Sequence, residues 1–263
     1  MPFKFWKKEK PEKVEEEKGK EEKAAGKPTP PPEERKPEPV VAKRPAPEPP
    51  GKAVAKALAP ADELLGQVHA SLVDLGLTVA ATKDIFLKRV AALPGGTAGF
   101  QKDYETEAYR AVTRVLASWL GVHAAPDFDP GKLLAEVNPR LSSFGLNVEV
   151  HDLSWLDQEL GLRKARLRLG EQEKVVRFKD ARDFLKGVND LIAPKRIRFI
   201  ELETWSDDFA FLMVRDPKWE QLAATELVVV KEPETASGGE CGECGAKVGR
   251  YWNDCLSCGA VFG

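Results

Sequence analysis

The pattern of apolar positions divides the chain into a helical first part and a strand-rich second part. Between residues 61 and 139, leucine, valine and aromatic side chains recur every three or four positions, which predicts amphipathic helices. The first of four expected helices covers residues 61–75. The second, third and fourth begin after the capping residues Thr82, Asp103 and Asp129, and Pro139 ends or bends the fourth.

From residue 146 the pattern changes to alternation, which is typical of half-buried strands. In ARLRLG (165–170), the apolar Ala165, Leu167 and Leu169 alternate with arginines. Further strands are expected at 147–153, 174–178, 196–202, 208–214 and 226–232, with a helix after Asp180. The expected fold class is α+β, with an antiparallel or mixed sheet, and the β-α-β-β-α-β order over 174–230 resembles a ferredoxin-like arrangement.

Composition sets the expected domain boundaries. Residues 1–60 hold 13 of the 20 prolines and 15 lysines and arginines, with three aromatic residues. Such a segment cannot bury enough apolar surface to offset the entropy of ordering it, so we expect a disordered tail. A globular α+β domain should follow over 61–232, then a linker over 233–239 and a separate terminal module over 240–263.

All four cysteines lie in the terminal module, in the order Cys241-x2-Cys244-x10-Cys255-x2-Cys258. Two residues between cysteines let the chain turn so that both sulfurs face one point, and two such turns can supply four thiolates to one metal ion. With a glycine after each pair, the stretch resembles a zinc ribbon. That resemblance implies one structural Zn²⁺ held by all four cysteines.

Three alternatives to zinc stay open at this point: two disulfides, unbound thiols, and iron in a rubredoxin-like site that uses the same turns. No apolar run is long enough to cross a membrane, and the first residues do not resemble a signal peptide, so we expect a cytoplasmic protein. Reducing conditions there favour metal binding over disulfides.

Exposed residues of the module are candidates for binding a partner. Tyr251 and Trp252 lie between the cysteine pairs, with Lys247 and Arg250 nearby, and this set could stack on nucleic acid or fill a pocket of a protein. The alternative is that both aromatic side chains fill the small core of the module.

A basic block and an acidic block follow one another in the second part. Residues 161–200 hold 12 Lys/Arg and 5 Asp/Glu, whereas residues 201–234 hold 3 and 9. Lys164, Arg166 and Arg168 should share one strand face and could contact phosphates. The alternative is a solvated face that pairs with the acidic block, and the acidic block would repel a polyanion, so we expect a protein partner rather than nucleic acid.

The acidic segment ELETWSDD is the best candidate for an enzyme site. Glu201 and Glu203 should share a strand face, with Asp207 and Asp208 in the following turn, and four carboxylates could bind a divalent cation and activate water. The alternative is a solvated acidic hairpin. Because the chain contains no Walker loop, G-x-G-x-x-G or G-x-S-x-G motif, we expect a non-enzymatic zinc-binding adaptor, with a metal-dependent hydrolase or nuclease as the alternative.

The first residues of the chain form one more candidate surface. FKFWKK places Phe3, Phe5 and Trp6 beside lysines, which suits an anionic membrane surface or a groove on a partner. The stretch is too short for a firm anchor, so only weak docking is expected.

Overall fold

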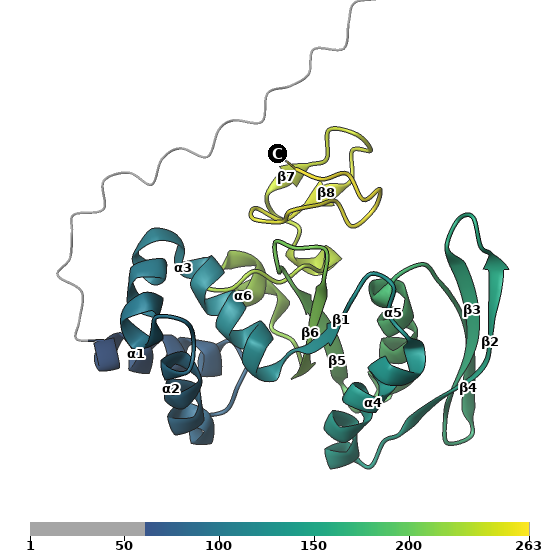
Figure 1. Cartoon of the computed structure of the whole chain (residues 1–263), viewed down its shortest axis with the longest axis horizontal. Helices are drawn as coiled ribbons and strands as arrows, with labels where there is room; N and C mark the ends of the chain where they lie inside the picture. Colours follow the sequence, from purple (N-terminus) through teal and green to yellow (C-terminus); the bar gives the residue numbers. More distant parts are fainter. Residues whose placement is uncertain (1–60, 263) are drawn as a thin grey trace, which may run out of the picture. The chain divides into compact units, whose positions relative to one another are not determined.

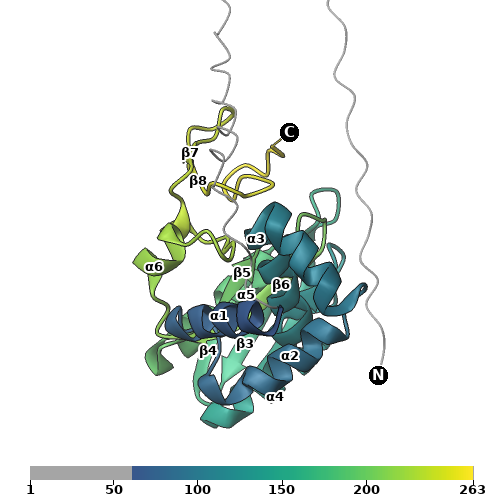
Figure 2. The ribbon, with the colours of Figure 1, turned by 90° about the vertical axis from the view of Figure 1, so that its left-hand side faces the viewer.

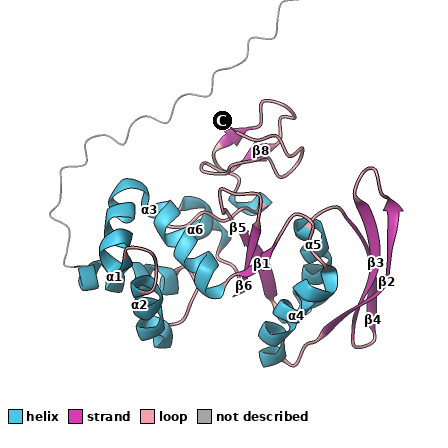
Figure 3. Ribbon diagram, viewed as in Figure 1, coloured by secondary structure: helices cyan, strands magenta, loops and turns pink. Residues whose placement is uncertain are grey.

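A computed structural model describes residues 61–262 of the chain. Helices and antiparallel sheets alternate in it, so that a layer of helices, a three-stranded sheet, a second layer of helices and a second three-stranded sheet follow one another (Figures 1 and 3). The predicted α+β class is therefore confirmed. The expected docking residues Phe3, Phe5 and Trp6 lie outside the described residues.

The first layer contains α1 (Ala61–Asp74), α2 (Lys83–Ala91) and α3 (Gly96–Leu120), and α1 and α2 lie in front of the sheets in Figure 2. Their apolar faces form one core with the adjacent three-stranded sheet, which we call the central sheet, and with α6 (Trp219–Ala224). The expected cap at Asp103 is wrong, because α3 already begins at Gly96 and Asp103 lies inside it. A kink at Glu107, with φ −146° and ψ 79°, interrupts this long helix.

The central sheet has the order β1-β6-β5 and is antiparallel throughout. Strands β5 (Ile197–Leu202) and β6 (Phe209–Arg215) were expected, whereas β1 (Val122–Ala124) was not, because three residues are too few to show alternation. The expected strand at 226–232 is reduced to one bridge between Leu202 and Val230, flanked by backbone hydrogen bonds to β5.

Two helices lie between the sheets and pack on both of them. They are α4 (Pro130–Leu141) and α5 (Ala181–Ile192), and their buried side chains form a second core with both sheets. Both expected caps are confirmed, since the Asp129 carboxylate accepts the amide of Lys132 and the Asp180 carboxylate accepts that of Asp183. Pro139 lies in the last turn of α4, which ends two residues later.

The outer sheet has the order β2-β3-β4 and consists of β2 (Val148–Asp157), β3 (Leu162–Leu169) and β4 (Gln172–Phe178). Ala165 and Leu167 are buried and Arg166 and Arg168 are exposed, as the alternation predicts. The ferredoxin-like arrangement does not form, because β4 pairs with β3 and belongs to a different sheet from β5 and β6.

The cysteine-rich end of the chain carries two short paired strands, β7 (Gly239–Glu240) and β8 (Lys247–Val248). The expected linker contains a short 3-10 helix, Pro233–Thr235, and the amide of Gly238 donates to the carbonyl of Val248 over 2.7 Å. In the described part of the chain, no helix has both the length and the apolar character that crossing a bilayer requires.

We expect Gly187→Ala to destabilise the protein by about 1–3 kcal/mol, because α5 lies too close to the outer sheet for a larger residue. A Cβ at this position would lie 2.2 Å from Cγ1 of Val176 and 3.3 Å from Cδ1 of Leu167. The control is Gly66→Ala in α1, where the nearest atom is the flexible Lys83 Nζ at 3.6 Å, and where the better helix propensity of alanine should stabilise by about 1 kcal/mol. Urea unfolding of both variants tests this, and equal midpoints would contradict the close packing.

Candidate metal centre

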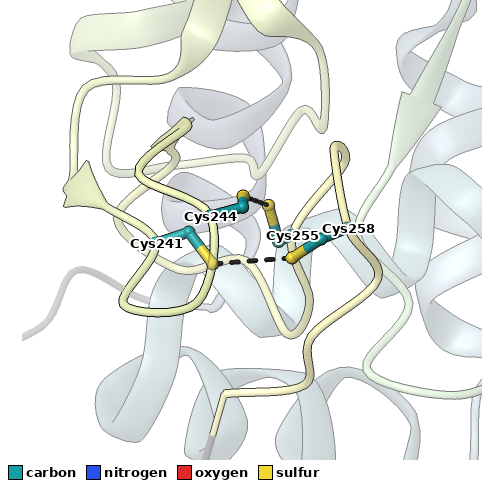
Figure 4. Close-up of side chains that lie close together, drawn as sticks. All are labelled: Cys241, Cys244, Cys255 and Cys258. Carbon is teal, nitrogen blue, oxygen red and sulfur yellow. Dashed lines mark hydrogen bonds between the residues drawn. The ribbon is translucent and has the colours of Figure 1, made fainter.

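The four cysteine sulfurs converge at one point in the structure. All four Sγ atoms lie within 4.8 Å of one another, and two pairs, Cys241 with Cys258 and Cys244 with Cys255, are each 3.7 Å apart (Figure 4). Each close pair joins one turn to the other. The two turns therefore face each other across a single centre, as their spacing predicts.

The distances between the sulfurs fit one tetrahedral ion. A metal bound to four thiolates at about 2.3 Å has sulfurs about 3.8 Å apart along each tetrahedron edge. The observed 3.7 Å agrees with that edge and is far longer than the bond of about 2.05 Å in a disulfide. All four cysteines are free, so the disulfide alternative does not describe this structure.

Local backbone geometry holds each pair of cysteines in place. Gly245 and Gly259, which follow the two pairs, adopt φ of 72° and 73°, a region that favours glycine. This conformation lets the amide of Gly245 donate to the carbonyl of Cys241, and that of Gly259 to the carbonyl of Cys255. The glycine after each cysteine pair therefore serves the turn that brings the two sulfurs together.

Four thiolates fill the coordination shell of a tetrahedral ion and leave no position for water or substrate. Cys241 and Cys255 are buried, while Cys244 and Cys258 are exposed, so the site lies at the edge of its own small core. The arrangement suits a structural metal ion that stabilises the fold around it.

The aromatic residues between the turns contact the rest of the protein. Trp252 is buried and its indole N–H donates to the carbonyl of Val230 over 3.0 Å, which corrects its assignment as a partner-binding residue and favours the alternative of a core residue. Tyr251 is half-buried, and its ring stacks on that of Tyr109 with 4.0 Å between centroids. Burial, together with a hydrogen bond to Glu107, raises the pKa of Tyr109 to about 12.

The two basic candidates of the module lie at the surface. Lys247 is exposed in β8, and Arg250 is exposed with an ion pair to Glu226 over 2.5 Å. Their role in binding a partner stays a prediction.

The four acidic candidates do not converge. Glu201 and Glu203 are buried, at 3% and 2% exposure, whereas Asp207 and Asp208 are exposed in the turn that follows. A metal site made of these carboxylates is therefore not assembled. The expectation of a solvated acidic face is also wrong for the two glutamates.

Two cations that sequence reasoning missed neutralise the buried glutamates. Arg182 donates to both carboxylate oxygens of Glu201, over 2.5 and 2.8 Å. Lys231, which is only 4% exposed, places Nζ 3.7 Å from Glu201 and 3.5 Å from Glu203. Burial alone would lower the pKa of Arg182, but the carboxylate of Glu201 outweighs burial and raises that pKa.

A third carboxylate reaches this cluster from the cysteine module. Asp254, the residue before Cys255, forms an ion pair with Lys231 and lies 3.6 Å from Arg182. We call these five residues the buried ion cluster: Arg182, Glu201, Glu203, Lys231 and Asp254. The sequence carries no local signal for this cluster, because its members come from separate segments. The burial of Lys231 cannot be predicted from a single lysine in the sequence.

The basic strand face is neutralised by its neighbours. Arg166 pairs with Asp152 over 2.6 Å and with Glu173 over 3.5 Å, and Arg168 donates through Nε to Glu149 over 3.0 Å. These carboxylates belong to the adjacent strands β2 and β4, so the expected pairing of Arg166 and Arg168 with residues 201–234 is wrong. Lys164 lies on the same face, opposite Ser154 and Arg177.

Comparison of the chain with protein-family models, with curated proteins and with solved structures finds no match. The assignment of a function therefore rests on the geometry of the site.

We expect Lys231→Met to destabilise the protein by about 3–5 kcal/mol, because it leaves the buried Glu201 and Glu203 and the half-buried Asp254 with one cation, Arg182. The matched control is Arg166→Met, which removes an exposed cation with two carboxylate partners and should cost less than about 1 kcal/mol. Chemical denaturation measures both values. A loss for Lys231→Met as small as that for the control would show that the buried ion cluster does not stabilise the fold.

Proposed function

We propose that the protein is a non-enzymatic, zinc-binding adaptor whose cysteine-rich end is a zinc ribbon. The observation that carries this proposal is the convergence of four thiols at tetrahedral spacing, with no other ligand type among them. Zinc suits such a shell because its filled d shell imposes no geometry of its own. The ion would stabilise the module and take no part in chemistry.

The charge distribution of the described residues supports a protein partner over nucleic acid. Phosphate backbones are bound by cations that are free to replace counterions. On the outer sheet, Arg166 and Arg168 are already paired with carboxylates of the same sheet. The nearby β2–β3 hairpin instead exposes large apolar side chains, which are more typical of protein contacts; they are Leu153, Trp155, Leu156 and Leu160.

A metal-dependent hydrolase receives no support from the acidic segment. Its two buried glutamates already have Arg182 and Lys231 as partners, and its two aspartates lie apart from them in solvent. We therefore do not propose a second function.

The full-length protein, purified without chelator, should contain about one Zn²⁺ per chain. When a competing chelator is added, the wild-type protein should keep its zinc, whereas the Cys258→Ala variant should lose it. Ser257→Ala is the matched control, because it changes the neighbouring residue and keeps all four thiols. Elemental analysis checks the stoichiometry; protein without metal, or with iron in place of zinc, would contradict the proposal.

Titration with labelled single- and double-stranded DNA and RNA at low salt tests the choice of partner. We expect no binding to wild type, since the arginines of the outer sheet are paired. Micromolar binding that Arg166→Ala/Arg168→Ala abolishes would contradict the preference for a protein partner and assign a nucleic-acid surface to this face.

A further inference from the structure

We propose that the metal site controls whether the cysteine module, residues 240–262, covers an aromatic surface of the α+β part of the chain. The covered surface consists of Tyr109, Trp205 and Val229, which belong to the same apolar cluster as Cys241 and Cys255. The module is then a metal-dependent cover. This inference rests on the proposed function, because it needs the four cysteines to bind metal.

Four consecutive residues of the module, 251–254, contact this surface and the residues beside it. Tyr251 stacks on Tyr109, and its carbonyl accepts the indole N–H of Trp205 over 3.2 Å. Trp252 donates to the carbonyl of Val230, and the amide of Asn253 donates to Glu203 over 2.8 Å. Asp254 completes the buried ion cluster, and the next residue is the metal ligand Cys255.

The conformation of residues 251–254 depends on the turn that holds Cys255 and Cys258. Cys255 donates its amide to the carbonyl of Ala260, Phe262 donates to that of Asn253, and Asp254 forms a bridge with Val261. The buried apolar side chains of the module are few: Cys241, Val248, Trp252 and Cys255. A core of this size does not fold unaided, whereas zinc contributes on the order of 10–16 kcal/mol to such modules.

The module can leave the α+β part without leaving a buried charge there unpaired, because of how charges are divided in the buried ion cluster. With the module in place, two cations, Arg182 and Lys231, face three carboxylates. Asp254 is the only one of these that belongs to the module. Its departure leaves two cations with Glu201 and Glu203, so no buried charge of the α+β part loses its last partner.

The covered surface has features that favour its use as a binding site. Trp205 adopts a φ of 53°, which is unusual for a large residue and presents its ring to Tyr109 at 5.8 Å between centroids. The amide of Trp205 donates to Glu203, a residue of the α+β part, so this conformation does not depend on the module alone. Clustered aromatic residues of this kind anchor protein interfaces, so an uncovered surface would fit an apolar segment of a protein.

Hydroxyl-radical footprinting of the full-length protein tests the cover directly, with zinc content measured in every sample. We expect oxidation of Tyr109 and Trp205 to rise several-fold when zinc is removed and to fall again when it is restored. Phe86 and Phe100, which are buried in the core of the first helices, should stay unreactive throughout.

The variant Tyr251→Ser/Asp254→Asn removes contacts to the surface and keeps all four cysteines. It should retain about one zinc per chain. Even with zinc bound, Tyr109 and Trp205 should be oxidised more in this variant than in wild type. If Tyr109 and Trp205 stay protected in zinc-free protein or in this variant, the inference is overturned, whereas the proposed zinc site is not. Oxidation of Phe86 on zinc removal would also overturn it, because the metal would then support the whole fold. Protein that binds no zinc would refute the proposed function and the inference with it.

Discussion

The arrangement of the described part depends on how the chain neutralises Lys231. Its ammonium group is almost fully buried, and an unpaired charge in that position would cost several kcal/mol. The partners come from two separate segments: Glu201 and Glu203 lie at the end of β5 and directly after it, and Asp254 lies in the cysteine module. Glu201 and Glu203 meet this requirement within the α+β part, and Asp254 adds a contact between the edge of the central sheet and the metal centre.

The local features of the fold could be predicted from the sequence. The helix caps at Asp129 and Asp180 and the alternation in β3 depend on neighbouring residues, and the cysteine spacing places two ligands in each turn. The division into two sheets could not be predicted, because it depends on which distant strands pair. The same limit applies to Glu201 and Glu203, whose acidic segment resembles a solvated hairpin until Arg182 and Lys231 are placed beside it.

Two charge clusters suggested chemistry from the sequence, and the structure pairs residues of both with opposite charges within the chain. Glu201 and Glu203 are paired with Arg182 and Lys231, Asp207 and Asp208 are exposed, and Arg166 and Arg168 are paired across the outer sheet. Both clusters therefore serve the fold, by joining segments or adjacent strands. Among the candidate sites that the sequence predicts and the structure describes, the four cysteines converge on a shared centre, and the proposed function begins from this candidate metal site.

X-ray absorption at the zinc edge, on the full-length protein as purified, tests the central claim most directly. We expect a single shell of four sulfur atoms at about 2.3 Å from zinc. A shell that contains nitrogen or oxygen ligands, or a sample in which zinc is not bound by these thiols, would contradict it.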